Sequence, residues 1–279
     1  MILIADSGAT KTEWLVKHYG QWKKPIRTAG FNPWQHKTES LKQSVLTLKR
    51  QIDYLDIEKL VFYGAGCGTQ VNQQKVLSLL SELFPTTKIT VSHDLMASAH
   101  ALLGHEAGIA CILGTGSNAC LFDGEKITAK ITSLGYILGD EGSGAHIGKM
   151  LCSAFFRQQL PKELADKFAE AYALQLPDFL TKVYHQPGAA AYLADFSRFA
   201  YANKSHSFIQ SLVSASFNLF IEYYIGCFNP DPNLAIGFTG SVAFYFQDEL
   251  RQQLNNKGFT VGKFMRSPAQ GLMDYYDKF

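Results

Sequence analysis

The sequence contains the same short plan twice: an apolar run, a turn of small polar residues, and a second apolar run. The first copy joins residues 1–5 to residues 13–19 through the turn Asp6-Ser7-Gly8-Ala9-Thr10-Lys11-Thr12. The second copy joins residues 108–113 to residues 119–122 through the turn Gly114-Thr115-Gly116-Ser117-Asn118. Apolar runs joined by a short turn of this kind are typical of a β-hairpin. The repetition therefore predicts two related domains, with a boundary between residues 107 and 108.

The rest of the chain alternates between helical and strand patterns. Apolar residues at helical spacing predict helices over residues 39–52, 72–84, 95–103, 242–254 and 269–278, and through most of residues 144–229. Short apolar runs predict further strands over residues 60–63, 89–92, 234–238 and 259–263. We therefore expect an α/β fold.

The composition argues against several classes of protein. Of the 279 residues, 47% are hydrophobic, which is enough for two cores and is not typical of a disordered chain. The net charge is +2, without the basic stripe expected of a nucleic-acid-binding protein. The five cysteines lack the spacing of a zinc or redox site. The sequence shows no leader peptide and no apolar run of the ~18 to 20 residues that a membrane span needs, so we expect a cytoplasmic protein without a membrane partner.

Both turns are suited to bind phosphate groups. Small residues let the backbone come close to an anion, and the N–H groups of a turn can form an anion-binding nest. In the first turn, Thr10 and Thr12 add hydroxyl groups, Lys11 adds a positive charge, and Asp6 could hold Mg²⁺ through water. The spacing of a Walker A loop is absent. Each turn alone could be an ordinary hairpin turn, but one turn in each half of the chain predicts a nucleotide, most simply ATP, in a cleft.

Three further segments place polar residues at the ends of strands or the starts of helices. Gly237-Phe238-Thr239-Gly240-Ser241 joins a strand to a helix, so its backbone could pack against adenine or ribose. Asp94 could cap a helix, or accept a proton from a hydroxyl group that attacks a phosphate. Gly139-Asp140-Glu141-Gly142-Ser143 could cap the helix that follows, or accept hydrogen bonds from sugar hydroxyls. Each of these segments has both a structural and a functional interpretation.

In this order, the segments resemble the N-acetylglucosamine kinase branch of the sugar kinase, Hsp70 and actin superfamily, which is also grouped with the BadF/BadG-type ATPases. The two turns match the phosphate motifs of that family, and the similarity covers most of the chain. The resemblance implies two ribonuclease-H-like (actin-like ATPase) domains that flank a nucleotide cleft. The first would comprise residues 1–107 with the C-terminal helix, about residues 267–279, returning to it, and the second residues 108–266.

The resemblance also implies a role for each matching residue. Asp94 matches the catalytic base of the family, and Thr10 and Thr115 match threonines that contact phosphate. The sugar-binding positions of the family correspond to Asn32, Ser117, Asn118, Gly135 and Asp140, and its adenosine motif includes Gly240 and Ser241. The implied enzyme uses ATP and Mg²⁺ to phosphorylate the 6-hydroxyl of an amino sugar, N-acetylglucosamine, and is a homodimer.

One segment departs from the family pattern and leaves the sugar open. Where the family commonly has two glycines and a tryptophan, this chain has Thr132-Ser133-Leu134-Gly135-Tyr136. Glucosamine and N-acetylmuramic acid are therefore alternative acceptors. A further alternative is an ATPase that activates a radical dehydratase, which would need cysteines for an iron–sulfur cluster. The nearest cysteines for that purpose, Cys120 and Cys152, have the apolar neighbours of core residues.

Overall fold

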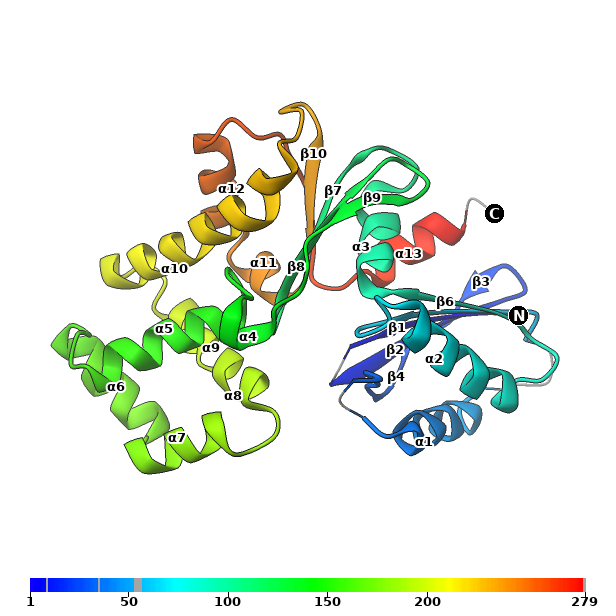
Figure 1. Cartoon of the computed structure of the whole chain (residues 1–279), viewed down its shortest axis with the longest axis horizontal. Coiled ribbons are helices and arrows are strands. Elements are labelled where there is room, and N and C mark those ends of the chain that lie inside the picture. Colours follow the sequence, from blue (N-terminus) through cyan, green and yellow to red (C-terminus); the bar gives the residue numbers. More distant parts are fainter. Residues whose placement is uncertain (9, 35, 53–56, 278–279) are drawn as a thin grey trace. The chain divides into compact units, whose positions relative to one another are not determined.

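The computed structural model describes residues 1–8, 10–34, 36–52 and 57–277 (Figure 1). Ala9, which belongs to the first turn, and Lys278, the expected last residue of the C-terminal helix, lie outside the described residues. The chain forms two compact units: an N-terminal unit of Met1–Gly104 with the segment from Pro268 onward, and a C-terminal unit of His105–Ser267. Each unit contains a mixed sheet and helices, so the expected α/β fold with two domains is confirmed.

In the N-terminal unit, three strand ends meet at one edge of the sheet. The strands are β1 (Ile2–Ser7), β2 (Lys11–His18), β3 (Gln21–Trp22), β4 (Ile26–Ala29), β5 (Lys59–Gly64) and β6 (Lys88–His93). The strands β1 and β2 form the expected antiparallel hairpin, while β5 and β6 run parallel to β1. The register pairs Ser7 with Gly64 and Gly64 with His93. The loops after β1, β5 and β6 therefore start side by side.

Helices cover both faces of this sheet. The helices α1 (Thr38–Lys49) and α2 (Gln70–Leu83) lie on one face, and α3 (Asp94–Leu103) and α13 (Ala269–Tyr276) lie on the other (Figure 1). Leu41, Val45 and Leu48 follow the spacing of one helical face of α1 and are buried. They join Trp14 and Phe62 of the sheet in one apolar core, which explains the periodicity of this segment.

The C-terminal helix α13 is fixed to the sheet by a buried network of hydroxyl groups. The Tyr63 hydroxyl oxygen lies 2.8 Å from that of Tyr276 and 2.8 Å from Nδ1 of His100. The His100 ring stacks on Tyr275, with ring centroids 4.2 Å apart. Because Tyr63 belongs to β5, this network joins the last helix of the chain to the middle of the N-terminal sheet.

We expect Tyr63→Phe to lower the free energy of unfolding by roughly 1–3 kcal/mol. The substitution keeps the ring and removes the hydroxyl that bridges Tyr276 and His100 inside the protein. Urea unfolding followed by circular dichroism measures the change. Tyr19→Phe is the matched control, because the Tyr19 side chain is 93% exposed. Equal stabilities of the two variants would contradict the prediction.

The C-terminal unit repeats the strand plan of the N-terminal unit. Its strands are β7 (Gly108–Leu113), β8 (Ser117–Phe122), β9 (Ile127–Lys130), β10 (Ala235–Thr239) and β11 (Val261–Met265). The order β9-β8-β7-β10-β11 corresponds to β3-β2-β1-β5-β6. In both sheets the first two strands form an antiparallel hairpin, and the remaining strands continue in parallel from the first. The relation between the two halves that the turns predict is thus confirmed in the topology.

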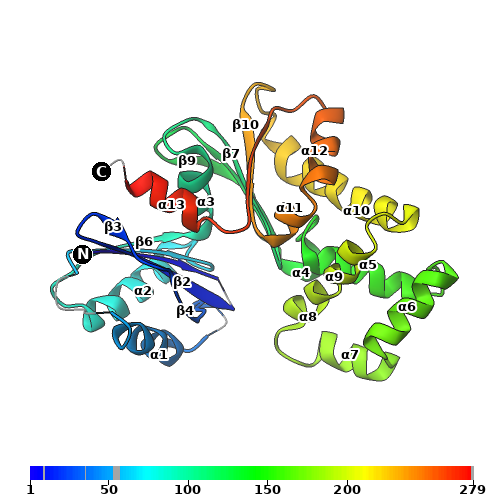
Figure 2. The ribbon, with the colours of Figure 1, turned by 180° about the vertical axis from the view of Figure 1, so that it is seen from behind.

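The C-terminal unit carries most of the helices. They are α4 (Gly135–Leu138), α5 (Gly144–Phe156), α6 (Lys162–Tyr172), α7 (Leu176–Tyr184), α8 (Ala189–Asp195), α9 (Ser197–Ala202), α10 (Ser207–Phe220), α11 (Ser241–Tyr245) and α12 (Gln247–Asn256). A π-helical turn over Ile221–Ile225 directly follows α10. The helices α6 and α7 lie farther from the sheet than α5 (Figure 2). Phe217, Phe220 and Phe238 belong to the core that joins the helices to the sheet.

The prediction of one helix over residues 242–254 is wrong. The chain forms α11 and α12 instead, and Phe246 between them has φ −104° and ψ 28°, outside the helical range. The Phe246 side chain is 2% exposed and packs edge-on against Phe217 and Tyr201. Burial of this ring therefore overrides the local helical pattern. The short strands β3, β4 and β9 are absent from the sequence-based assignment because they are brief and half exposed.

Membrane spanning by a helix finds no support in the structure: within the described residues, no helix combines the length and the apolar character required to cross a bilayer.

Candidate active site

Two acidic residues lie at the edge of the N-terminal sheet where β1, β5 and β6 end. Asp6 is the penultimate residue of β1, and Asp94 follows β6 as the first residue of α3. The pKa of Asp6 is raised to about 7, first by burial and then by the negative charges of Asp94 and Glu13, while Lys11 opposes the shift. The two aspartates therefore lie close enough to interact, and a cation beside them would be stabilised.

The structure contradicts a capping role for Asp94. The N-cap position of α3 is His93, whose side chain makes no capping hydrogen bond. Asp94 is itself the first helical residue, and its Oδ1 atom accepts a hydrogen bond from the Leu95 amide at 2.9 Å. The side chain is half-buried at the edge of the sheet. The Asp94 carboxylate therefore lies at the start of α3 and bonds to its first turn, and its functional interpretation stays a prediction.

Buried hydrogen bonds of Ser7 and Thr12 stabilise the first turn. The Thr12 hydroxyl lies 2.7 Å from Ser7 Oγ, and Ser7 Oγ accepts a hydrogen bond from the Phe31 amide at 3.1 Å. Thr12 is fully buried, so its hydroxyl supports the turn, whereas the sequence-based interpretation directs it to a phosphate. Thr10 and Lys11 are exposed and Gly8 is half-buried, and these residues form the accessible part of the turn.

Asn32 lies at the same edge of the sheet as Asp6 and Asp94. Its Oδ1 atom accepts a hydrogen bond from the Trp34 amide at 3.0 Å, and its own amide donates to Nδ1 of His36 at 3.0 Å. The loop after β5 passes directly beneath it: a Cβ atom on Gly66 would lie only 2.2 Å from Asn32 Oδ1. Asn32 is thus fixed over the end of β5, between the ends of β1 and β6 in the sheet order.

The second turn is joined to the start of α5 in the C-terminal unit. The amide of Gly144 donates to the Gly114 carbonyl at 2.8 Å, and the amide of Ala145 donates to the Thr115 carbonyl at 3.1 Å. Within the turn, the Gly114 amide donates to the Gly116 carbonyl at 3.0 Å. These bonds fix the backbone of the turn, while the Thr115 side chain remains exposed.

Asp140 reaches the second turn from the acidic segment. Its Oδ1 atom accepts a hydrogen bond from the Ser117 amide at 3.2 Å, and the residue is 7% exposed. Burial raises the pKa of Asp140, against the effect of the Ser117 bond. Asp140 also has a φ of 57°, a left-handed conformation that is uncommon outside glycine but that aspartate adopts more readily than most residues. The residue predicted to contact sugar therefore also bonds to Ser117 at the end of the second turn.

The helix cap after the acidic segment is Ser143, whose Oγ atom accepts a hydrogen bond from the His146 amide at 3.1 Å. The expectation that this segment caps the following helix is therefore confirmed through Ser143, and neither Asp140 nor Glu141 is the capping residue. Gly135 lies at the start of α4, and no atom lies within 4 Å of a Cβ atom added at this position. Its carbonyl accepts a hydrogen bond from the Gly139 amide at 2.8 Å.

Ser117 and Asn118 begin β8, so their side chains point to opposite faces of the sheet. The Ser117 hydroxyl is buried and makes no hydrogen bond within the described residues, although the Tyr224 hydroxyl lies near it. Asn118 is half-buried, and its Oδ1 atom accepts a hydrogen bond from the Ala119 amide at 2.9 Å. Only one of the two side chains can therefore face the side of the sheet that carries Asp140 and Tyr224.

The third turn packs directly on the second. Gly240 has a φ of +112°, and a Cβ atom at this position would lie 2.2 Å from the Leu113 carbonyl oxygen. The Gly240 amide donates to the Met265 carbonyl at 3.0 Å. Ser241, which follows, is the exposed first residue of α11. Gly114 and Gly240 are thus neighbours because β7 and β10 pair in parallel and end together.

We expect Gly240→Ala to weaken ATP binding at least roughly tenfold and to destabilise the C-terminal unit by a few kcal/mol. The new methyl group would collide with the backbone of the second turn and force the two turns apart. Gly188→Ala is the matched control, because Gly188 has a φ of +84° but no atom within 4 Å of the added Cβ. Isothermal titration with AMPPNP compares the two variants, and equal affinities would contradict the prediction.

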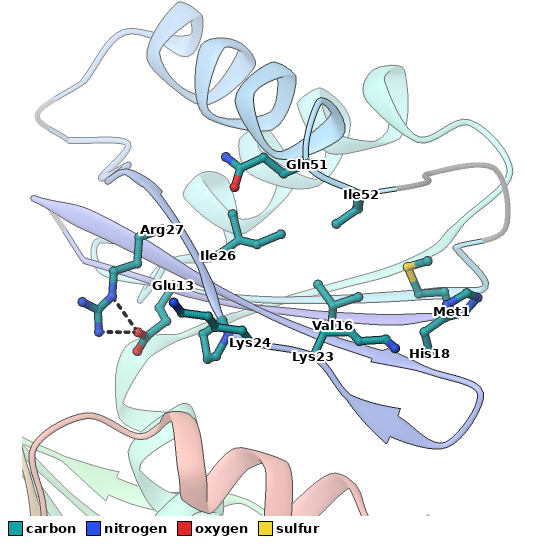
Figure 3. Close-up of a pocket in the computed structure, with 11 residues that line it drawn as sticks. Met1, Glu13, Val16, His18, Lys23, Lys24, Ile26, Arg27, Gln51 and Ile52 are labelled. Carbon is teal, nitrogen blue, oxygen red and sulfur yellow. Dashed lines mark hydrogen bonds and ion pairs between the residues drawn. The ribbon is translucent and has the colours of Figure 1, made fainter.

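The metal-ligating side chains and the cavity in Figure 3 are two further features that bear on the candidate site. Among the described residues, no set of three or more histidine, cysteine and acidic side chains is arranged to hold a metal ion. The cavity, of about 810 Å³, has Val16, Ile26 and Ile52 among its lining residues (Figure 3). Its lining extends from Met1, beside the start of β1, to Glu13, which pairs with Asp6 across the first hairpin.

The chain is similar over its whole length to a candidate N-acetylglucosamine kinase from Porphyromonas gingivalis. The two proteins share 38% of their residues, the match covers 100% of this chain and 99% of that chain, and the TM-score is 0.94. The fold is also that of a candidate N-acetylglucosamine kinase from Chromobacterium violaceum, with 15% identity, coverage of 98% of each chain and a TM-score of 0.71. A ROK-family glucokinase from Streptomyces griseus, solved with glucose and AMPPNP, matches with 14% identity, coverage of 99% and 98%, and a TM-score of 0.58. No family model and no curated protein matches the sequence.

The P. gingivalis relative establishes the class, that of ATP-dependent sugar kinases with an actin-like ATPase fold. The chain belongs to the N-acetylglucosamine kinase branch of the sugar kinase, Hsp70 and actin superfamily. The resemblance drawn from the sequence motifs is therefore confirmed.

Proposed function

We propose that the protein transfers the terminal phosphoryl group of ATP to the 6-hydroxyl of an amino sugar, most simply N-acetylglucosamine. The observation that carries the proposal is the meeting of Asp94, Asp6 and Asn32 at one edge of the N-terminal sheet. This edge offers a carboxylate for a hydroxyl proton, a second carboxylate for a cation, and an amide for a sugar. The relative with 38% identity is a candidate N-acetylglucosamine kinase, which supports the choice of sugar.

In the proposed reaction, Asp94 accepts the proton of the sugar 6-hydroxyl as its oxygen forms a bond to the terminal phosphorus. The bond between that phosphorus and the bridging oxygen of ADP breaks, so the products are the sugar 6-phosphate and ADP. Phosphoryl transfer depends mainly on positioning and on stabilisation of charge. Gly8, Thr10 and Lys11 of the first turn and Gly114, Thr115 and Gly116 of the second would contact phosphate groups. Gly240 and Ser241 would lie against the adenosine.

Asp6 fits a magnesium site of the kind that uses few protein ligands. Mg²⁺ in kinases keeps several waters and is bound by one or two carboxylates together with substrate phosphates. The raised pKa of Asp6 reflects a carboxylate that is buried beside other negative charges, a surrounding that favours a cation. When bound, Mg²⁺ would neutralise phosphate charge, while Asp6 would hold it through water.

Each unit offers its own candidate sugar-binding residues. In the N-terminal unit the proposed sugar-binding residue is Asn32. In the C-terminal unit the proposed residues are Ser117, Asn118, Gly135 and Asp140. The departure of residues 132–136 from the family pattern keeps glucosamine and N-acetylmuramic acid as alternative acceptors. The dehydratase-activator alternative is less well supported, because Cys120 and Cys152 are 0% and 1% exposed in the core.

A screen of ATP consumption tests the proposed function. Purified protein is incubated with ATP, Mg²⁺ and each of a panel of amino and muramyl sugars, and ADP release is followed with a coupled assay. We expect turnover with N-acetylglucosamine, and mass spectrometry should place the phosphate at the 6-position. If none of the sugars causes ATP consumption, the sugar-kinase proposal is wrong. Stoichiometric iron in anaerobically purified protein would favour the dehydratase activator instead.

A further inference from the structure

The acidic segment of the C-terminal unit is held by Tyr224, a residue that no sequence motif indicates. Tyr224 is 3% exposed. Its hydroxyl accepts a hydrogen bond from the Asp140 amide at 3.0 Å and donates one to Glu141 Oε2 at 3.2 Å. A single hydroxyl therefore uses its donor and an acceptor position on two consecutive acidic residues.

The bond to Asp140 supports a main-chain conformation that is less favourable than the ordinary helical or extended ones. The φ of 57° at Asp140 lies in the left-handed region, which costs free energy for a residue with a side chain. This conformation also lets the Asp140 carboxylate accept the hydrogen bond from the Ser117 amide. Tyr224 thus fixes the main chain of Asp140, while Ser117 fixes its side chain.

The bond to Glu141 leaves one side of that carboxylate available. Oε2 is bonded to Tyr224, whereas Oε1 makes no hydrogen bond to any residue that the structure describes. The Glu141 side chain is half-buried. A carboxylate that is held by one oxygen and open at the other is a suitable acceptor for a hydroxyl group of a ligand.

Tyr224 owes its place to the π-helical turn that follows α10. Such turns are rare and occur frequently at functional sites. The Tyr224 ring stacks on Phe220, with centroids 4.8 Å apart and planes at 18°, whereas the neighbouring Tyr223 is 46% exposed. The turn therefore directs one of two consecutive tyrosines to the acidic segment.

We propose that Tyr224 is a positioning residue for the sugar-binding acids, which holds Asp140 in its left-handed conformation and presents Glu141 to a sugar hydroxyl. It acts through these two residues and does not contact the reacting atoms. The inference rests on the proposed function, since it names part of the sugar side of that same site. It implies an acceptor with a hydroxyl that Glu141 can bind, a feature of amino sugars generally.

The test compares Tyr224→Phe with Tyr223→Phe, a control with the same chemical change in the same turn. With the sugar that the wild-type protein phosphorylates, we expect Tyr224→Phe to raise the sugar KM roughly tenfold or more. The ATP KM should change by less than about twofold, because the phosphate turns keep their own backbone bonds. Hydrogen exchange should become faster in residues 139–143 of Tyr224→Phe. Tyr223→Phe should match the wild type in all three measurements.

Two outcomes would overturn the inference: an unchanged sugar KM in Tyr224→Phe, or an equal loss of affinity for both substrates, which indicates general damage. A double variant with Glu141→Gln adds a second criterion. If Tyr224 acts partly through Glu141, the double variant should raise the sugar KM by less than the product of the two single effects, and a full product would contradict this part of the inference. Wild-type protein that phosphorylates no sugar would contradict the proposed function instead. In that case, unchanged exchange in residues 139–143 would still overturn the positioning role of Tyr224.

Discussion

Asp94→Asn should lower kcat at least about a hundredfold and leave the fold intact, because general base catalysis typically contributes roughly 10²- to 10⁴-fold. The asparagine keeps an oxygen that can accept the Leu95 amide hydrogen bond, so the start of α3 should persist. It cannot accept the proton of the sugar hydroxyl. The KM for ATP should change little, because the proposed role of Asp94 concerns the attacking hydroxyl and not the nucleotide.

Glu39→Gln is a suitable control for the Asp94 experiment. Glu39 is an exposed acid in the first turn of α1 in the same unit, so its neutralisation changes the charge at a helix start without touching the site. Initial rates with saturating ATP and sugar give kcat, and circular dichroism checks the fold. Near-normal turnover of Asp94→Asn would refute the assignment of Asp94 as the base.

The sequence predicts those parts of the site that follow directly from strand ends. Asp6 and Asp94 both come at the end of an apolar run, and parallel strands bring such ends to one edge of a sheet. The burial of the Thr12 hydroxyl, in contrast, depends on the register of the first hairpin. Thr12 pairs with Ser7 across the turn, and this pairing buries its hydroxyl. The orientation of a side chain in a hairpin depends on this register, and the composition of the turn alone does not contain it.

Contacts between distant residues account for what the sequence does not predict. Tyr224 reaches Asp140 across 84 positions of the chain, through a π-helical turn whose sequence resembles any other apolar helix. The break between α11 and α12 likewise depends on the burial of Phe246 against Phe217 and Tyr201. In both cases tertiary packing decides the outcome, and local periodicity carries no sign of it.

Asp6→Asn should have opposite effects on activity and stability. In the proposed mechanism Asp6 holds Mg²⁺, so its loss should lower kcat/KM for ATP by at least about a hundredfold, a size typical of lost stabilisation of transferring phosphate. In the free protein, however, the Asp6 carboxylate is buried beside Asp94 and Glu13. Its ionised form therefore destabilises the folded state, and the neutral asparagine should relieve this cost.

The sign and the pH range of the stability effect follow from the pKa of Asp6, which is raised from an ordinary value of 3.8 to about 7 by folding. Below the ordinary value, Asp6 is protonated in both states and costs nothing. As the pH rises towards 7, the unfolded chain releases this proton while the folded protein retains it, so stability falls. Above pH 7 the full cost applies. It is on the order of 4 kcal/mol, because a tenfold difference in proton affinity between the two states corresponds to about 1.36 kcal/mol.

Urea unfolding of metal-free protein at about pH 5 and about pH 8 tests this prediction, with EDTA present to remove divalent cations. Asp6→Asn should be more stable than the wild type by a few kcal/mol at the higher pH, and the difference should shrink at the lower pH. Asp274→Asn is the control, because Asp274 is an exposed acid on α13 of the same unit. A less stable Asp6→Asn variant at the higher pH would show that the Asp6 carboxylate is stabilised by its surroundings. The proposed preference of the site for a cation would then be unsupported. That preference depends on an ionised Asp6 carboxylate that destabilises the folded protein until a positive charge lies beside it.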